Sequence, residues 1–215
     1  MKLELIDNKS DKLILFLTGW GCDANQFRNM KAKKYDVLIA YDYVDTKLEF
    51  DFSKYKEINL IAFSAGVLMA CLLKNKLPKL NKKIAFNGNP KNFDEYFGVP
   101  ENVGKAFKSI TKETVVPFRR EYLVYDDKEL KMCNYYHSSR GIEDSNKEFS
   151  KLEEYAKKVK EPLNFDLVML SDADKVFNFN RQMEYYKNQK CKVMHNCAHF
   201  PFYQYTDFDK IIEMA

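Results

Sequence analysis

The stretch INLIAFSAGVLMA, residues 58–70, decides the fold expected for this chain. An apolar run at 58–63 leads directly into Ser64, after which small residues open a second apolar run at 65–74. A short apolar run that stops at a turn indicates a buried strand, and the second run has helical character. Strand, serine and helix in this order match the nucleophile elbow G-x-S-x-G, which reads A-x-S-A-G here. A serine that only caps a helix produces the same local pattern, so other parts of the chain must decide whether Ser64 is a nucleophile or a cap.

Apolar runs and helical patterns alternate along the rest of the chain. Further buried strands are predicted at residues 13–17, 36–41, 83–86, 165–170 and 192–195, and helices at 147–158 and 205–215, the latter capped by Thr206. Asp23 is the expected N-cap of a helical turn. Alternating strands and helices favour a mostly parallel sheet that is covered by helices on both faces.

The pattern changes between about residues 101 and 160, where helices rich in Lys, Glu and aromatic residues replace the strands. Ligand sites in parallel sheets lie outside the carboxyl ends of the strands. We therefore expect one domain over residues 1–215, of the α/β-hydrolase fold, in which 101–160 is inserted as a helical lid over that edge.

Charge and cysteine usage narrow the functional classes. The chain carries 35 Lys and Arg against 31 Asp and Glu, interspersed, which is not the charge pattern of a nucleic-acid-binding protein. No apolar run approaches the roughly 20 residues of a membrane span, and the first residues lack the apolar stretch of a signal peptide. The five cysteines form neither C-x-x-C pairs nor metal-ligand spacings. We therefore expect a cytoplasmic protein with reduced thiols, no metal site, no cofactor and no membrane partner.

A glycine-containing turn follows the first predicted strand. Its sequence is Thr18-Gly19-Trp20-Gly21, at the place where this fold carries an oxyanion-hole loop. The backbone N–H groups of Trp20 and of Ala65, the residue after the serine, are the predicted oxyanion donors. Trp20 is the only tryptophan, and its side chain suits a core position equally well.

An acid and a histidine complete the pattern. Asp174 follows the predicted strand at 165–170 and is our choice to orient the histidine, with Asp172 as the alternative. His199 follows the last predicted strand and precedes the final helix, so the chain order is Ser, Asp, His, as in this fold. Of the other two histidines, His195 is expected to be structural and His137 to lie in the lid, within reach of a substrate.

Four segments carry a resemblance to a known family. They are FLTGWGCDANQF (16–27), NLIAFSAGVLMA (59–70), NGNP (87–90) and AHFPF (198–202). With them, the chain resembles the BioG family of pimeloyl-[acyl-carrier protein] methyl ester esterases, which are related to the BioH esterases. The resemblance implies hydrolysis of the carrier-bound methyl ester to methanol and pimeloyl-carrier in biotin biosynthesis, with acyl-carrier protein as partner. It also implies Ser64, Asp174 and His199 as the catalytic triad, and Trp20 and Ala65 as the oxyanion donors.

Two positions depart from the general hydrolase pattern: Thr18 stands where a histidine is usual, and Ala62 replaces the first glycine of the elbow. Neither change removes a catalytic atom, because the predicted donors are backbone amides. Two other classes stay open: another serine acyl hydrolase, such as a thioesterase or small-ester carboxylesterase, and a hydrolase-like binding protein without catalysis.

The lid supplies candidate substrate and carrier contacts. Arg119, Arg120 and Arg140 could meet acidic side chains of a carrier or the phosphate of its prosthetic group. Phe118 and Tyr122 could line an acyl tunnel. Each arginine fits a solvated surface position equally well, and aromatic residues in a lid are often simply its core.

Overall fold

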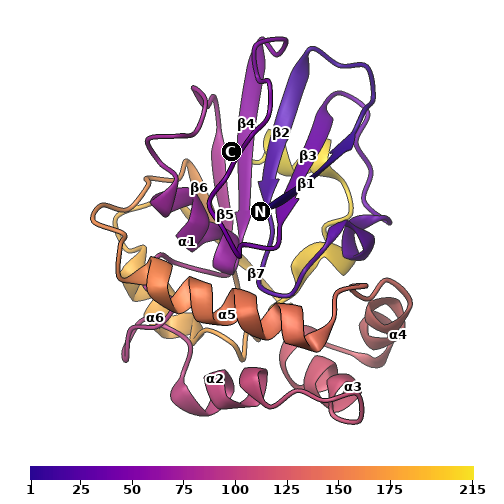
Figure 1. Cartoon of the computed structure of the whole chain (residues 1–215), viewed down its shortest axis with the longest axis vertical. Helices are drawn as coiled ribbons and strands as arrows, with labels where there is room; N and C mark the ends of the chain where they lie inside the picture. Colours follow the sequence, from indigo (N-terminus) through magenta and orange to yellow (C-terminus); the bar gives the residue numbers. More distant parts are fainter.

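A seven-stranded sheet runs through the molecule, whose computed structural model describes all 215 residues (Figure 1). Its strands are β1 (Lys2–Ile6), β2 (Lys12–Leu17), β3 (Asp36–Tyr41), β4 (Glu57–Phe63), β5 (Lys83–Phe86), β6 (Leu167–Ser171) and β7 (Cys191–Met194). Their order across the sheet is β1-β3-β2-β4-β5-β6-β7. The β1–β3 pair is antiparallel and all the other pairs are parallel. The predicted α/β-hydrolase fold class is confirmed.

Alternate residues of the central strands enter two separate cores. On β2, Ile14 and Phe16 pack in one core, and Leu13, Leu15 and Leu17 pack in the other. All five side chains are fully buried. These strands are continuous apolar runs in the sequence because both of their faces are buried. Burying each such side chain stabilises the folded state by roughly 1.5–3 kcal/mol.

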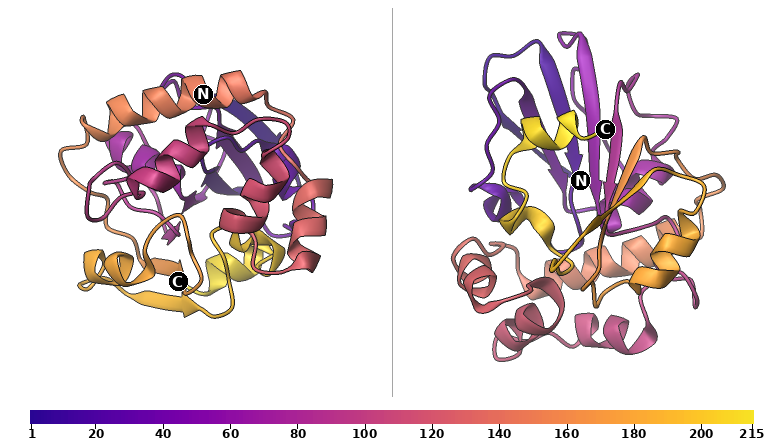
Figure 2. Two further views of the ribbon diagram at one scale, coloured as in Figure 1. Left: turned by 90° about the horizontal axis from the view of Figure 1, so that it is seen from below. Right: turned by 180° about the vertical axis from the view of Figure 1, so that it is seen from behind.

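Helices cover both faces of the sheet (Figure 2). One face carries α1 (Ala65–Leu72), α6 (Phe179–Tyr185) and the end of α5 (Ile142–Ala156). The other carries α7 (Phe208–Glu213) and two short 3₁₀ turns, Ala24–Phe27 and Pro201–Tyr203. Asp23 caps the first of these turns by accepting from the Asn25 N–H, as predicted.

The segment between β5 and β6 is helical and lies beyond the carboxyl ends of the strands (Figures 1 and 2). It contains α2 (Glu101–Lys108), α3 (Val115–Phe118), a π-helical turn (Arg119–Leu123), α4 (Asp127–Tyr135) and α5. Its own small core joins Phe107, Phe118 and Phe149. Whether this block opens as a lid stays a prediction.

Two elements were missed by the sequence-based predictions, and one helix start and one helix cap differ from them. Strand β1 was not expected, because an edge strand with one exposed face has no continuous apolar run. Helix α5 begins at Ile142, five residues before the predicted start. Helix α7 is capped by Asp207, whose carboxylate accepts from the Lys210 N–H, and not by Thr206. Helix α6 was also missed.

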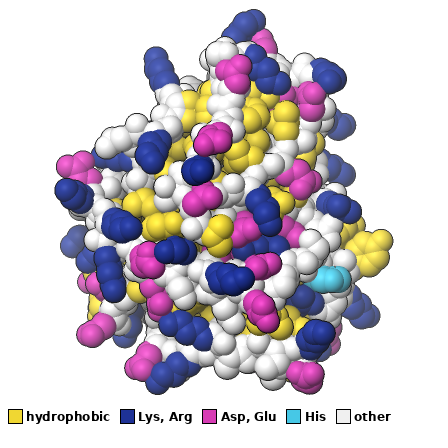
Figure 3. Space-filling model, in the orientation of Figure 1, with side chains coloured by type: hydrophobic (Ala, Val, Ile, Leu, Met, Phe, Trp, Pro, Cys, Tyr) yellow, Lys and Arg dark blue, Asp and Glu magenta, His cyan; other side chains and the backbone are white.

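Basic and acidic side chains intermingle over the face drawn in Figure 3. This surface agrees with the interspersed charges of the sequence. None of the helices combines the length and the apolarity that crossing a bilayer requires.

Candidate active site

Ser64 occupies a sharp turn between β4 and α1. Its backbone φ of 53° lies in the left-handed region, which costs energy for a residue with a side chain. The turn is tightly enclosed: a Cβ added to Gly66 would lie 2.1 Å from the Leu17 carbonyl oxygen, and one on Gly88 would lie 2.5 Å from the Ser64 carbonyl oxygen. The surrounding backbone therefore holds the serine in this strained conformation.

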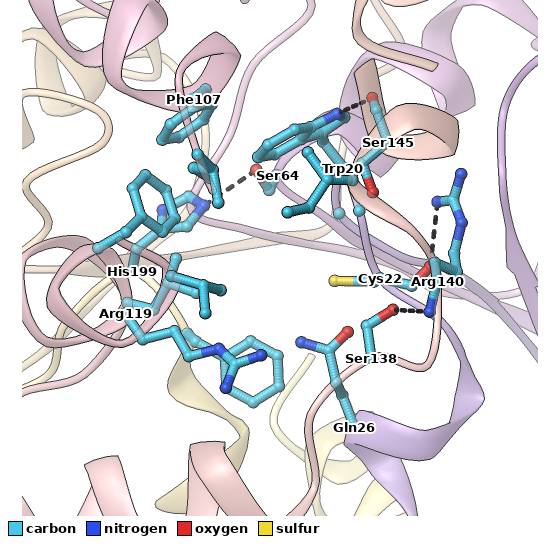
Figure 4. A pocket seen from close by; sticks show the side chains of 18 of the residues that line it. Trp20, Cys22, Gln26, Ser64, Phe107, Arg119, Ser138, Arg140, Ser145 and His199 are labelled. Carbon is cyan, nitrogen blue, oxygen red and sulfur yellow. Dashed lines mark hydrogen bonds between the residues drawn. The ribbon is translucent and has the colours of Figure 1, made fainter. Parts of the chain in front are cut away.

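Ser64 joins His199 and Asp174 in a chain of hydrogen bonds, of which Figure 4 shows the one between Ser64 and His199. The Ser64 Oγ lies 2.9 Å from Nε2 of His199, and the His199 Nδ1 lies 2.9 Å from Oδ2 of Asp174. An ionised carboxylate only accepts, so Nδ1 carries the ring proton and Nε2 is free to take the proton of the hydroxyl. The other oxygen of Asp174 accepts from the N–H groups of Val176 and Phe177, which holds the carboxylate still.

Asp172, the alternative acid, lies elsewhere. Its Oδ2 is 3.0 Å from Nδ1 of His195, whose side chain is 78% exposed. The structure therefore brings Asp174, and not Asp172, to His199. His137 is exposed and does not line the cavity described below.

The two predicted oxyanion donors flank the serine. Ala65 is the first residue of α1, and Trp20 lies in the turn after β2. That turn touches the elbow, because a Cβ added to Gly19 would lie 3.3 Å from Cβ of Ser64. Neither the Trp20 nor the Ala65 N–H donates to another group of the chain, so both can donate to a negatively charged oxygen next to Ser64.

A cavity of about 140 Å³ opens beside Ser64 and His199. Half of its 20 lining residues are hydrophobic, and its aromatic wall consists of Trp20, Phe63, Phe107, Phe118 and Phe200. Polar groups from Gln26, Arg119 and Ser138 also line it (Figure 4), as does Asn146. An apolar cavity with a few polar groups suits a small ligand or an acyl chain.

The candidate lid contacts divide into two groups. Phe118 and Arg119 line the cavity, and the Arg119 guanidinium donates to Oδ1 of Asn134 at 3.0 Å. Tyr122 packs against Phe118, with ring centroids 5.1 Å apart, but does not line the cavity. Arg120 is exposed and pairs with Asp127 at 2.6 Å.

Arg140 lines the cavity too, and its contact with a carrier stays a prediction. Its side chain is only 5% exposed, and its guanidinium pairs with Asp42 at 2.8 Å and with Glu148 at 2.6 Å. This guanidinium already has two carboxylate partners within the chain, unlike that of Arg119.

Sequence reasoning missed two buried polar residues near the site. Asn87 bonds to the segment that carries His199, and its only sequence signal was its place in the NGNP motif. Glu148 lies on α5, where its charge in an amphipathic helix indicated an exposed face. Burial raises the pKa of Glu148 although the Arg140 guanidinium lowers it. Burial also raises the pKa of the Cys22 thiol, which borders the cavity.

Comparisons with known proteins found a family model and solved structures that match this chain. A model of the family described as "Pimeloyl-ACP methyl esterase BioG" matches residues 1–211. The crystal structure of BioG from Haemophilus influenzae has a TM-score of 0.85 and 26% identity, over 98% of this chain and 99% of that chain. A protein from the same species, named only as uncharacterized, is 27% identical over 219 residues, 98% of this chain and 99% of its own length.

More distant structures share the fold alone. An alpha/beta hydrolase fold protein from Burkholderia ambifaria has a TM-score of 0.61 and 14% identity, over 94% of this chain and 89% of that chain. The arrangement of sheet and helices thus occurs well beyond the BioG structures.

Proposed function

The chain belongs to the BioG family of pimeloyl-ACP methyl esterases, and we propose that it hydrolyses the methyl ester of pimeloyl-[acyl-carrier protein]. The products are methanol and pimeloyl-[acyl-carrier protein], and the reaction is a step of biotin biosynthesis in the cytoplasm. The observation that carries the proposal is the hydrogen-bonded chain Ser64–His199–Asp174 at the wall of a largely apolar cavity.

The chemistry proceeds by acyl transfer. His199 takes the proton of Ser64 through Nε2 while Oγ attacks the ester carbonyl, and Asp174 stabilises the resulting imidazolium. The N–H groups of Trp20 and Ala65 donate to the oxyanion of the tetrahedral intermediate, where each donor typically contributes about 3–4 kcal/mol. His199 then protonates the departing methoxide, which leaves as methanol. A water molecule, deprotonated by the same histidine, releases the acyl group from Ser64.

The cavity suits the proposed acyl chain. Aromatic rings from Phe107, Phe118 and Phe200 provide an apolar wall for methylene groups beside Ser64. Arg119 lines the same cavity and forms no ion pair within the chain, because its bond is to the neutral amide of Asn134. Its charge remains available to an anionic group of the carrier or of its phosphate-bearing arm.

The test compares the wild-type protein with Ser64→Ala on three substrates: the carrier-bound methyl ester, a free short-chain methyl ester, and pimeloyl-carrier thioester. We expect methanol release chiefly from the carrier-bound ester, and a loss of about a thousandfold or more in Ser64→Ala. Wild-type Ser64 should also react with a serine-directed fluorophosphonate. Retention of about a tenth of turnover by Ser64→Ala would exclude Ser64 as the nucleophile. Faster hydrolysis of the thioester or of the free ester would identify one of the alternative acyl hydrolases.

A further inference from the structure

We propose that Glu148 is a positioning residue that holds the oxyanion loop, residues 18–22, in its donating conformation. The proposal rests on the proposed function, because it assigns the Trp20 N–H to a transition-state oxyanion. Glu148 reaches the loop from α5, at a sequence distance of 127 residues.

Both carboxylate oxygens of Glu148 are used. Its Oε2 accepts from the Gly21 N–H at 2.9 Å, and its Oε1 accepts from the Tyr43 N–H at 2.8 Å. The Glu148 side chain is fully buried, with 0% of its surface exposed. A buried carboxylate that accepts two backbone N–H groups ties the loop after β2 to the loop after β3, and both loops to α5.

The Gly21 bond restrains the peptide plane next to the one that carries the oxyanion donor, the Trp20 N–H. The peptide between Trp20 and Gly21 is planar, so fixing the Gly21 N–H fixes the plane that follows Trp20. Gly21 itself has a φ of 68°, a conformation that glycine adopts readily and from which a released loop would move easily. Without the carboxylate, the partly buried Gly21 N–H would lose its partner and the loop would reorient to find another.

A second contact ties the same loop to the same helix (Figure 4). The indole N–H of Trp20 donates to the Ser145 carbonyl on α5 at 2.6 Å. The indole also stacks on Phe107 of α2, with centroids 4.9 Å apart and planes inclined by 7°. The only tryptophan of the chain therefore reports on the position of the oxyanion loop.

Arg140 supports Glu148 electrostatically. Burying a carboxylate without a counter-charge is costly, and the Arg140 guanidinium supplies that charge at 2.6 Å. The same guanidinium pairs with Asp42, which Lys2 also contacts at 2.9 Å, so two cations face two carboxylates. Arg140 donates as well to the carbonyl of Cys22, the last residue of the loop, at 3.3 Å.

The test is Glu148→Gln, which keeps the shape of the side chain but replaces one acceptor oxygen with an NH₂ group. A displaced oxyanion donor weakens transition-state binding more than substrate binding, so we expect kcat to fall about tenfold to a hundredfold with KM changed by less than about threefold. The affinity for a trifluoromethyl ketone, whose hydrate oxygen mimics the oxyanion, should fall with kcat. The emission or acrylamide quenching of Trp20 should change as well.

Asp36→Asn is the matched control. Asp36 is also fully buried and accepts two backbone N–H groups, from Asn8 at 2.9 Å and Ser10 at 3.0 Å. It begins β3, at the end of the sheet away from the site. We expect Asp36→Asn to lower stability while kcat and Trp20 emission stay close to wild type. An equal loss of kcat in both variants would overturn the proposal, because a general loss of packing would then explain it.

Arg140→Lys keeps the inference testable if Glu148→Gln does not fold. This variant leaves the Glu148 carboxylate in place but weakens its pairing with the cation at position 140. A lower kcat and altered Trp20 quenching are expected. Wild-type kcat and emission in every folded variant would overturn the proposal. A wild-type protein with no ester turnover would overturn the proposed function instead, and the fluorescence comparison would then decide the Glu148 tether separately.

Discussion

The side-chain amide of Asn87 donates a hydrogen bond of 2.8 Å to the backbone carbonyl of His199. The same nitrogen donates to the Ser171 hydroxyl at 2.8 Å, and the amide oxygen accepts from the Ser171 N–H at 2.8 Å. Asn87 is buried and follows β5, with a φ of 41° that asparagine tolerates better than most residues. One amide thus joins the ends of β5 and β6 to the segment that carries the histidine.

Asn87→Asp should impair both stability and catalysis. The change replaces a donor with a carboxylate oxygen that faces two acceptors, and each unsatisfied buried group costs about 1–3 kcal/mol. We expect a lower denaturation midpoint and a lower kcat, because the His199 backbone loses its support. Asn59→Asp is the control: Asn59 is buried near the amino end of β4 and its amide also bridges polar groups. That variant should lose stability but keep kcat, and a kcat equal to wild type in Asn87→Asp would contradict the prediction.

Asp174→Asn should cost far more activity than Asp172→Asn. Asp174 accepts a hydrogen bond from the Nδ1–H of His199, whereas Asp172 contacts the exposed His195. An amide at 174 would present a donor to the ring and favour the wrong tautomer, so we expect kcat to fall by about a thousandfold or more. Steady-state kinetics of the two variants decides between the acids, and equal losses would refute the assignment.

Gly66→Ala should destabilise the chain strongly, whereas Gly104→Ala should not. A methyl group at 66 would meet the backbone of Leu17 and Thr18, and backbone atoms cannot rotate away. We expect a loss of about 3 kcal/mol or more. Gly104 lies in α2 with nothing within 4 Å of its added Cβ, so alanine there should stabilise by up to about 1 kcal/mol. Urea denaturation of both variants measures the contrast, and similar midpoints would rule out the close packing of the elbow.

Arg119→Glu should weaken hydrolysis of the carrier-bound ester several-fold or more, with little effect on a small free ester. The residue lines the cavity without an internal carboxylate partner, while Ser64 and His199 stay untouched. Arg120→Glu should have a smaller effect, because Asp127 already neutralises that guanidinium. Raised salt should lower the activity of the wild-type protein on the carrier-bound ester in the same way. Salt screens charges at the rim of a site, and such charges act mainly on the rate at which the carrier meets the protein and on its orientation. An equal loss of activity on both substrates would indicate a folding defect. Unchanged activity on both would mean that the carrier binds elsewhere, with the lysines as the next candidates.

Thiol alkylation should leave esterase activity intact. All five cysteines are free, and burial raises the pKa of Cys71 to about 11 and that of Cys22 further. The reactive thiolate forms only as the pH approaches these raised pKa values, so iodoacetamide at about pH 8 should react slowly with both residues. Activity measured against alkylation by mass spectrometry tests this. Loss of activity in step with modification of Cys22 would contradict it.

Local pattern was enough for strands β2 to β7, the elbow and the histidine. Strands β2 to β6 are short apolar runs because both of their faces are buried, so the polarity of each residue indicates its burial. Ser64 and His199 stand out because each follows a predicted strand and the chain order of this fold restricts which residues can meet. The Trp20 turn was found in the same way, from glycines at the end of a strand.

Tertiary structure alone decided which of the charged residues act together. Asp172 and Asp174 follow the same strand two residues apart, and only the packing of the β7–α7 segment brings His199 to the second. Arg140 and Glu148 read as surface charges of an amphipathic region, yet they are buried against loops about a hundred residues or more earlier in the chain. Sequence periodicity indicates on which side of a helix or strand a residue lies, because this side depends only on residues close by in the sequence. The partner that a buried charge finds there depends on how distant segments pack, and no local pattern contains that information.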